Sequence, residues 1–230
     1  MKFLFRIFWM PLYSLWALRY IRRERIYKHA GLRLAIPPGV FHPGVFLSTP
    51  VFVSFLQEID FQGKTVLDVG TGSGLIALFA ARRGALVTAL DINPLACETA
   101  RRNAEKNNLP LRIVESDLFD NLPPQSFDYL LINPPYFPRD PVSAAEHAFF
   151  AGDNFGYFEK LFSCMPAFMH RAPRRTEVWL IMSKDAHFEK IKTVAAAHGI
   201  RLEIVLEKKK WGKCLVVVAV NSELQNDDAG

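Results

Sequence analysis

The sequence predicts an α/β protein with a seven-stranded, mostly parallel sheet whose last strand is antiparallel. Short apolar segments alternate with helical segments from Thr65 to Val220, and this alternation is typical of βαβ units. A glycine-rich turn joins the first of these strands to the helix that follows it. The last two strands are separated only by the segment KKKWGK. That segment is too short for a crossover helix, so it predicts an antiparallel hairpin.

The strands are predicted where short runs of apolar and β-branched residues lie between turn signals or helical segments. The first run lies between Gly63 and Gly70 and is expected to be buried. The predicted strands are Thr65–Val69, Ala85–Asp91, Leu111–Glu115, Tyr129–Ile132, Glu177–Met182, Arg201–Glu207 and Leu215–Val220.

The helices are predicted from apolar residues at helical spacing and from signals at the helix ends. Gly84 is suited to end the second helix, Pro94 to begin the third, and Pro166 to interrupt the fourth. A loop rich in proline and glycine, Ala35–Pro50, precedes the first helix. The predicted helices are Val51–Ile59, Leu75–Arg83, Pro94–Asn107, Phe155–His170 and Asp185–His198.

Positive charge is concentrated at the N-terminus of the chain. The formal net charge is +5, but residues 1–35 hold eight lysines and arginines against one acid, which leaves 20 bases and 22 acids elsewhere. A body without a basic excess makes a nucleic-acid partner less expected, since phosphate backbones attract basic surfaces. The three cysteines and six histidines show no metal-ligand or disulfide spacing. We therefore expect no metal and a reducing, cytoplasmic setting.

The first 31 residues are aromatic, apolar and basic, and two interpretations of them stay open. Their longest uncharged run, Ile7–Leu18, has 12 residues, whereas a helix needs about 20 to span a bilayer. The segment is predicted either to pack as a helix on the body or to lie peripherally on an anionic membrane. We predict three parts: a helical extension over residues 1–34, an α/β domain over 35–221, and a disordered polar tail over 222–230.

Acidic and glycine residues follow successive predicted strands. Gly70, Gly72 and Gly74 form the turn after the first strand, and glycines let a ligand lie against the backbone. Asp91 ends the second strand, where a carboxylate can accept both hydroxyls of a ribose. Asp117 follows the third strand and could accept from the exocyclic amine of an adenine. The pattern predicts a pocket for an adenosine that carries an amino acid.

The motifs LDVGTGSG, LDIN and SDLF occur in this order and with the spacing of a known family. The chain therefore resembles the class I methyltransferases that depend on S-adenosylmethionine (SAM), over roughly residues 40–220. The resemblance implies a Rossmann-like fold and SAM as the cofactor. It implies that SAM is held by Asp68, Gly70, Thr71, Gly72, Gly74, Asp91, Ile92, Asp117 and Leu118, although Asp68 could instead only bond the amides of the turn.

The motif NPPY, Asn133–Tyr136, follows the fourth strand, which is expected to end beside the ligand site. Pro134 and Pro135 stiffen the chain there, so the Asn133 side chain and the Pro134 carbonyl can accept hydrogen bonds from a planar –NH₂ group. Tyr136 can cover the flat face of that group. These four residues are the predicted catalytic set, and Asn133 is also expected to lie against the cofactor.

NPPY resembles the motif of two methyltransferase groups, the HemK type, which acts on protein glutamines, and enzymes that act on base amines of nucleic acids. The segment AGDNFG after NPPY is similar to the HemK type. So is the loop GVFHPGVFLST, except that Ser48 stands where an acid is expected; its Thr49 is expected to touch the cofactor.

We therefore expect a SAM-dependent N-methyltransferase with a protein glutamine as its first substrate. A small or membrane-associated molecule is the second possibility, and an adenine or guanine amine in nucleic acid is the third. The alternative from another class is a module that binds SAM without turnover, and the intact NPPY motif argues against it.

Overall fold

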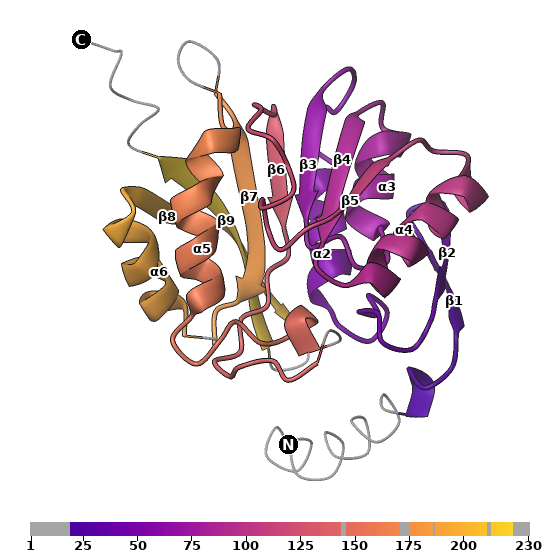
Figure 1. Cartoon of the computed structure of the whole chain (residues 1–230), viewed down its shortest axis with the longest axis horizontal. Helices are drawn as coiled ribbons and strands as arrows, with labels where there is room; N and C mark the ends of the chain where they lie inside the picture. The colour runs from indigo at the N-terminus through magenta and orange to yellow at the C-terminus, as the bar shows by residue number, and fades with distance from the viewer. Residues whose placement is uncertain (1–18, 144–145, 171–174, 186, 211–212, 223–230) are drawn as a thin grey trace.

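The computed structural model contains one seven-stranded sheet, as predicted (Figure 1). It describes residues 19–143, 146–170, 175–185, 187–210 and 213–222. The strand order is β5-β4-β3-β6-β7-β9-β8, and β9 runs antiparallel to both of its neighbours. The strands are β3 (Thr65–Val69), β4 (Leu86–Asp91), β5 (Arg112–Glu115), β6 (Tyr129–Ile132), β7 (Glu177–Ser183), β8 (Ile200–Lys210) and β9 (Lys213–Ser222).

Helices cover both faces of this sheet, and a separate hydrophobic core fills each side. On one face lie α2 (Ser48–Leu56), α3 (Leu75–Arg82) and α4 (Pro94–Asn107). On the other lie α5 (Gly156–Cys164), the short 3₁₀ helix η2 (Met165–Phe168) and α6 (Phe188–Ala197). Strands with apolar residues on both sides are expected for a sheet that is covered on both faces, and all four residues of β6 are buried.

Local signals in the sequence account for several helix ends. The side chain of Asn93 accepts a hydrogen bond from the backbone N–H of Leu95 at the start of α4, and Asn108 ends that helix in the left-handed conformation. The helix predicted over Phe155–His170 stops as α5 at Cys164, and the chain continues as η2. Pro166 lacks the N–H that would continue the helical hydrogen bonds.

The prediction of a helical extension over residues 1–34 is wrong for the part of that segment that forms strands. Two strands, β1 (Arg25–His29) and β2 (Leu32–Ile36), form an antiparallel hairpin that turns at Ala30 and Gly31. In β1 half-buried and exposed residues alternate with the period of a strand, whereas four of the five residues of β2 are buried. The aromatic and basic composition of the segment concealed both strands. Residues 1–18 lie outside the described part of the chain, as do residues 223–230 of the predicted tail.

The predicted boundary at residue 35 falls within β2, whose apolar side chains belong to the core beside α3 and α4. The division into an extension and an α/β domain stays a prediction. Within the described ranges, no helix has the length and apolar character needed to cross a bilayer.

A buried asparagine joins the hairpin to the sheet domain. The Asn103 side chain accepts from the backbone N–H of Ala35 (2.8 Å) and donates to the carbonyls of Ala35 (3.2 Å) and Ser73 (2.9 Å). Asn103 is fully buried, so these backbone groups cannot turn to water instead. One side chain thus connects β2, α4 and the loop before α3.

We expect Asn103→Ala to lower the free energy of unfolding by about 2–4 kcal/mol, because it leaves buried backbone groups unpaired. Asn107→Ala is the matched control, because Asn107 bonds the backbone of Arg33 in the same way but lies nearer the surface. This variant should lower the free energy of unfolding by about 1 kcal/mol or less. Urea denaturation of the two variants measures both. Equal losses would show that the Asn103 contacts do not hold the hairpin.

Candidate functional site

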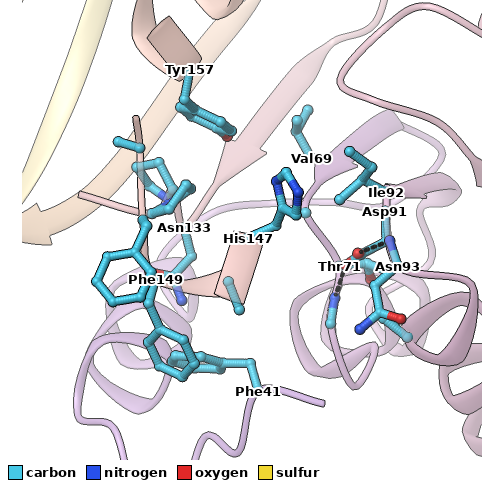
Figure 2. Close-up of a pocket in the computed structure, with 18 of the residues that line it drawn as sticks. Phe41, Val69, Thr71, Asp91, Ile92, Asn93, Asn133, His147, Phe149 and Tyr157 are labelled. Atoms are coloured by element: carbon cyan, nitrogen blue, oxygen red, sulfur yellow. Dashed lines mark hydrogen bonds between the residues drawn. The ribbon is translucent and has the colours of Figure 1, made fainter. Parts of the chain in front are cut away.

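A cavity of about 390 Å³ opens where β3, β4 and β6 end. In parallel strands the carboxyl ends meet at one edge, so residues far apart in sequence come together there. Figure 2 shows side chains from both halves of the sheet facing this space. The cavity is lined by the predicted residues Thr49, Gly70, Thr71, Gly72, Asp91, Ile92, Asp117, Leu118, Asn133, Pro134, Pro135 and Tyr136.

Two of the three predicted glycines face the cavity, and the third does not. Gly70, Gly72 and Gly74 all have positive φ angles, of 78°, 55° and 86°. A Cβ atom on Gly70 would stand in open space, whereas one on Gly74 would lie 3.2 Å from the Cβ of Ala100. Gly74 therefore lets α3 and α4 approach each other, while Gly70 leaves room for a ligand against the backbone.

Asp91 ties the glycine turn to the end of β4. Its Oδ2 accepts from the backbone N–H of Gly72 at 2.8 Å, and its Oδ1 accepts from the backbone N–H of Asn93 at 2.9 Å (Figure 2). Burial raises the pKa of this carboxyl, and the two hydrogen bonds act against that rise. Each oxygen still has a lone pair for a ligand, as a carboxylate that binds two hydroxyls requires.

Asp68 lies beneath the turn and does not line the cavity. It is fully buried, and its Oδ2 accepts from Thr71 Oγ1 (2.7 Å) and from the backbone N–H of Ala77 (3.2 Å). Its Oδ1 has no hydrogen-bond partner among the described residues. Burial raises the pKa of Asp68 to about 7, despite the opposing bonds from Thr71 and Ala77. The geometry supports the interpretation that Asp68 braces the turn.

The third acid, Asp117, is held by a lysine that the sequence did not single out. Lys160 on α5 lies 2.7 Å from Asp117 and 2.7 Å from Asp120, and it also lines the cavity. Leu118 follows in the left-handed conformation, with φ of 51°, which is strained for a residue of this kind. Asp117 keeps one carboxylate oxygen that Lys160 does not engage.

The NPPY segment follows β6 and forms the opposite wall of the cavity. The amide nitrogen of Asn133 donates to Thr49 Oγ1 at 3.0 Å, and Thr49 lies in the first turn of α2. Since the donor side of the amide is engaged by Thr49, its carbonyl oxygen remains to accept from a ligand. Pro134 and Pro135 are buried, and Tyr136 is half-buried. Thr49 thus lines the cavity, and its side chain bonds Asn133.

An aromatic rim of three phenylalanines surrounds this end of the cavity, and sequence reasoning missed it. The ring centroid of Phe41 lies 4.7 Å from that of Phe46, and Phe149 lies 5.7 Å and 5.1 Å from these two. All three line the cavity. Phe41 and Phe46 belong to the loop GVFHPGVFLST, which was recognised but only for Thr49. Only the fold brings Phe149 to them.

His147 and Tyr157 also line the cavity and were not predicted. His147 belongs to the 3₁₀ helix η1 (Glu146–Ala148), and in Figure 2 its ring lies between Asn133 and Asp91. Tyr157 comes from α5, and burial raises its pKa. Among the residues that the structure describes, no group of three or more histidines, cysteines and acids is placed to hold a metal ion.

Comparison with known proteins gives one family and several relatives. The model of the family described as "Methyltransferase small domain" matches residues 31–152. A Methanocaldococcus jannaschii protein that carries the name protein N5-glutamine methyltransferase is 38% identical over 109 residues, which are 47% of this chain and 53% of that one. A tRNA1(Val) (adenine(37)-N6)-methyltransferase of Pedobacter heparinus is 34% identical over 154 residues, 63% of this chain and 62% of its own. The chain spans 53%, 37% and 29% of the length of three curated relatives.

Solved structures of low sequence identity share the fold. One is the 16S rRNA N2 G1207 methyltransferase of T. thermophilus in complex with AdoMet and guanosine. It superposes with a TM-score of 0.63 at 18% sequence identity, and the match covers 87% of this chain and 50% of that chain. Another is the E. cuniculi Mtq2–Trm112 complex, with a TM-score of 0.60 at 19% sequence identity. This match covers 80% of this chain and 99% of that chain. The predicted Rossmann-like methyltransferase fold is confirmed.

The buried carboxyl of Asp68 should make stability depend on pH. Its pKa rises from 3.8 to about 7 on folding, so between these values the folded protein binds more protons than the unfolded chain. The free energy of unfolding should therefore fall as the pH rises from about 4 to about 7. Asp68→Asn should flatten this dependence by roughly 1–3 kcal/mol, measured by urea denaturation across that pH range.

Asp128 offers a control of the opposite sign. Its partial burial is outweighed by hydrogen bonds from the backbone N–H and hydroxyl of Thr65, which lower the pKa of Asp128. Its stabilisation is therefore present above the unfolded pKa and lost as the pH falls, so Asp128→Asn should cost more at neutral pH than in acid. A pH profile that Asp68→Asn leaves unchanged would contradict the assigned shift.

Proposed function

The chain belongs to the family of the methyltransferase small domain, and we propose that it transfers a methyl group from SAM to a nitrogen attached to an sp² carbon. The observation that carries this proposal is the anchored amide of Asn133, which faces the cavity between buried prolines and the hydroxyl of Thr49. It presents an acceptor of hydrogen bonds where a planar –NH₂ group can approach.

SAM is the cofactor that the family and the fold support, since solved neighbours hold AdoMet and SAH. The cavity fits such a group: Gly70 leaves open space against the backbone, and the Asp91 carboxylate keeps lone pairs on both oxygens. When bound, SAM supplies a methyl group that a positively charged sulfur makes electrophilic. We propose that Asp91 accepts from the ribose hydroxyls and that Asp117 accepts from the adenine amine.

The remaining predicted residues have supporting roles in this proposal. Gly70, Gly72 and Thr71 offer their backbone along one side of the cavity, and Ile92 and Leu118 offer apolar surface on the adenine side. Asp68 and Gly74 act indirectly, because Asp68 bonds the turn and Gly74 admits α4. Lys160 would fix the rotamer of Asp117 through their ion pair.

The acceptor nitrogen needs orientation more than it needs a base. An amide or exocyclic amine donates its lone pair into a π system, so it is a weak nucleophile. Two hydrogen-bond acceptors, the Asn133 side chain and the Pro134 carbonyl, would turn that lone pair towards the methyl group and stabilise positive charge as it forms on nitrogen. Tyr136 lies beside Phe137, with 5.0 Å between ring centroids, and would cover the face of the planar group.

We propose the side-chain amide of a protein glutamine as the first acceptor. The HemK-like segments and the relative named as an N5-glutamine methyltransferase support this choice. The aromatic rim and the relatives named as tRNA adenine methyltransferases support a base amine as the second candidate, since aromatic rings stack on flat bases.

Asp91→Ala should weaken SAM binding by about 1–3 kcal/mol, because it removes an acceptor of charge-assisted hydrogen bonds. Asp120→Ala is the matched control, since Asp120 pairs with Lys160 but does not line the cavity. Isothermal titration of wild type and both variants with SAM measures the change. Equal affinities, or a wild type that prefers NAD to SAM, would refute the assignment of the pocket.

Asn133→Ala should lower turnover by about 10²-fold while SAM affinity stays nearly constant, because it removes an interaction that strengthens towards the transition state. Thr49→Val should lower turnover by about tenfold through loss of the amide anchor, and Thr49→Ser should restore it. Single-turnover rates on the acceptor and SAM titrations separate these effects. A near-normal rate for Asn133→Ala would reduce NPPY to a structural turn.

A further inference from the structure

We propose that the end of the molecule that carries the cavity docks on an anionic lipid surface. Two sets of described residues would make the contact, the arginines of residues 19–25 and exposed apolar side chains around the cavity mouth. This inference goes beyond methyl transfer, and lipid binding can be measured without it.

The basic segment lies beside the cavity, which its place in the sequence does not reveal. Arg25 pairs with Ile36, the residue at which β2 leads into the cavity-lining loop. The ring of His42 in that loop lies 5.3 Å from Tyr20 and 5.7 Å from Tyr27, centroid to centroid. Residues 20–27 therefore pack on the loop that carries Phe41 and Phe46. Figure 1 shows the start of the described chain at the same end as η1.

The charge of this segment is strongly positive. Residues 19–25 contain four arginines and one acid. The acid, Glu24, pairs with Arg102 of α4 at 2.6 Å, and Arg25 lies over the ring of Tyr20. Arg22 and Arg23 are exposed, and the described acids form no ion pair with them. Each such residue near an anionic lipid surface adds favourable binding energy.

Exposed apolar side chains also lie at this end of the sheet. Leu95, Phe137 and Val142 are 42%, 45% and 85% exposed. All three follow strand ends that form the cavity, Leu95 after β4 and the other two after β6. Behind them lies the aromatic rim, which is half-buried. Large apolar side chains next to basic ones are the composition of surfaces that insert into the lipid headgroup region.

A lipid surface accounts for these features better than a nucleic acid does. The arginines alone would be enough to bind a phosphate backbone. Exposed leucine and valine side chains contribute favourable binding free energy only when they leave water, as they do in a lipid headgroup region. Docking in this orientation would open the cavity towards the membrane, where an acceptor held at the lipid surface could enter.

The first test compares two charge reversals in the full-length protein. Arg22→Glu with Arg23→Glu alters the proposed contact, and Arg112→Glu with Arg201→Glu makes the same change at the exposed starts of β5 and β8, the opposite end of the sheet. Co-sedimentation uses phosphatidylcholine vesicles with and without phosphatidylglycerol. We expect binding only with phosphatidylglycerol, weakened by salt, and about 30-fold weaker in the Arg22/Arg23 variant alone.

The second test reports the orientation. An environment-sensitive fluorophore is attached to Val142→Cys or, as the control, to Leu86→Cys, which is exposed at the opposite end of the sheet. Both labels are placed in a background with Cys164→Ser and Cys214→Ser, and Cys97 is buried. Anionic vesicles should shift the emission of the label at position 142 to the blue and leave the label at position 86 unchanged.

Three results would overturn the proposal: no binding to anionic vesicles at low salt, equal losses in the two charge-reversal variants, or no spectral shift at position 142. A protein that ignores vesicles but binds single-stranded RNA, and loses that binding in the Arg22/Arg23 variant, would make the basic segment a nucleic-acid surface instead. Failure of methyl transfer with intact vesicle binding would refute the proposed function alone.

Discussion

The shape of the cavity depends on the contacts of one carboxylate. Asp91 ends β4, accepts from the backbone of Gly72 after β3, and accepts from Asn93 before α4. These bonds hold the glycine turn open at the edge where the parallel register of β3 with β4 and β6 brings the strand ends together. The acid that shapes the turn is also the acid that we propose accepts from the ribose, so in this proposal one side chain serves both binding and architecture.

The two walls of the cavity are positioned by different means. The wall after β3 and β4, which we propose holds SAM, is built from backbone, with glycines at positive φ and a buried carboxyl beneath them. The wall after β6, which we propose holds the methyl acceptor, is built from stiff side chains, because two buried prolines and the Thr49 hydroxyl leave Asn133 little freedom. Such preorganisation is what the proposed reaction requires, since its nucleophile is weak and the chain offers orientation in place of a strong base.

The sheet and twelve of the residues that line the cavity could be predicted because they depend on local patterns. Apolar runs, turn glycines and the acids after strand ends appear directly in the sequence, and NPPY marks its own position. The hairpin of β1 and β2 is local in sequence, but the aromatic and basic composition of the segment led to the prediction of a helix. The aromatic rim and the Lys160–Asp117 pair could not be predicted, since each depends on contacts between segments far apart in sequence. Gly74 matched a motif for binding, but its neighbour is Ala100 of α4, a contact that the sequence does not reveal.

The identity of the methylated atom tests the central claim most directly. Labelled SAM is offered to wild type and to Asn133→Ala with protein, RNA, lipid and small-molecule fractions of a lysate, and the product is characterised by mass spectrometry. The proposed role of Asn133 requires one fraction to gain a methyl group on an amide or amine nitrogen and requires the variant to lose most of that transfer. A methyl group on oxygen, carbon or sulfur, or undiminished transfer by the variant, would contradict it.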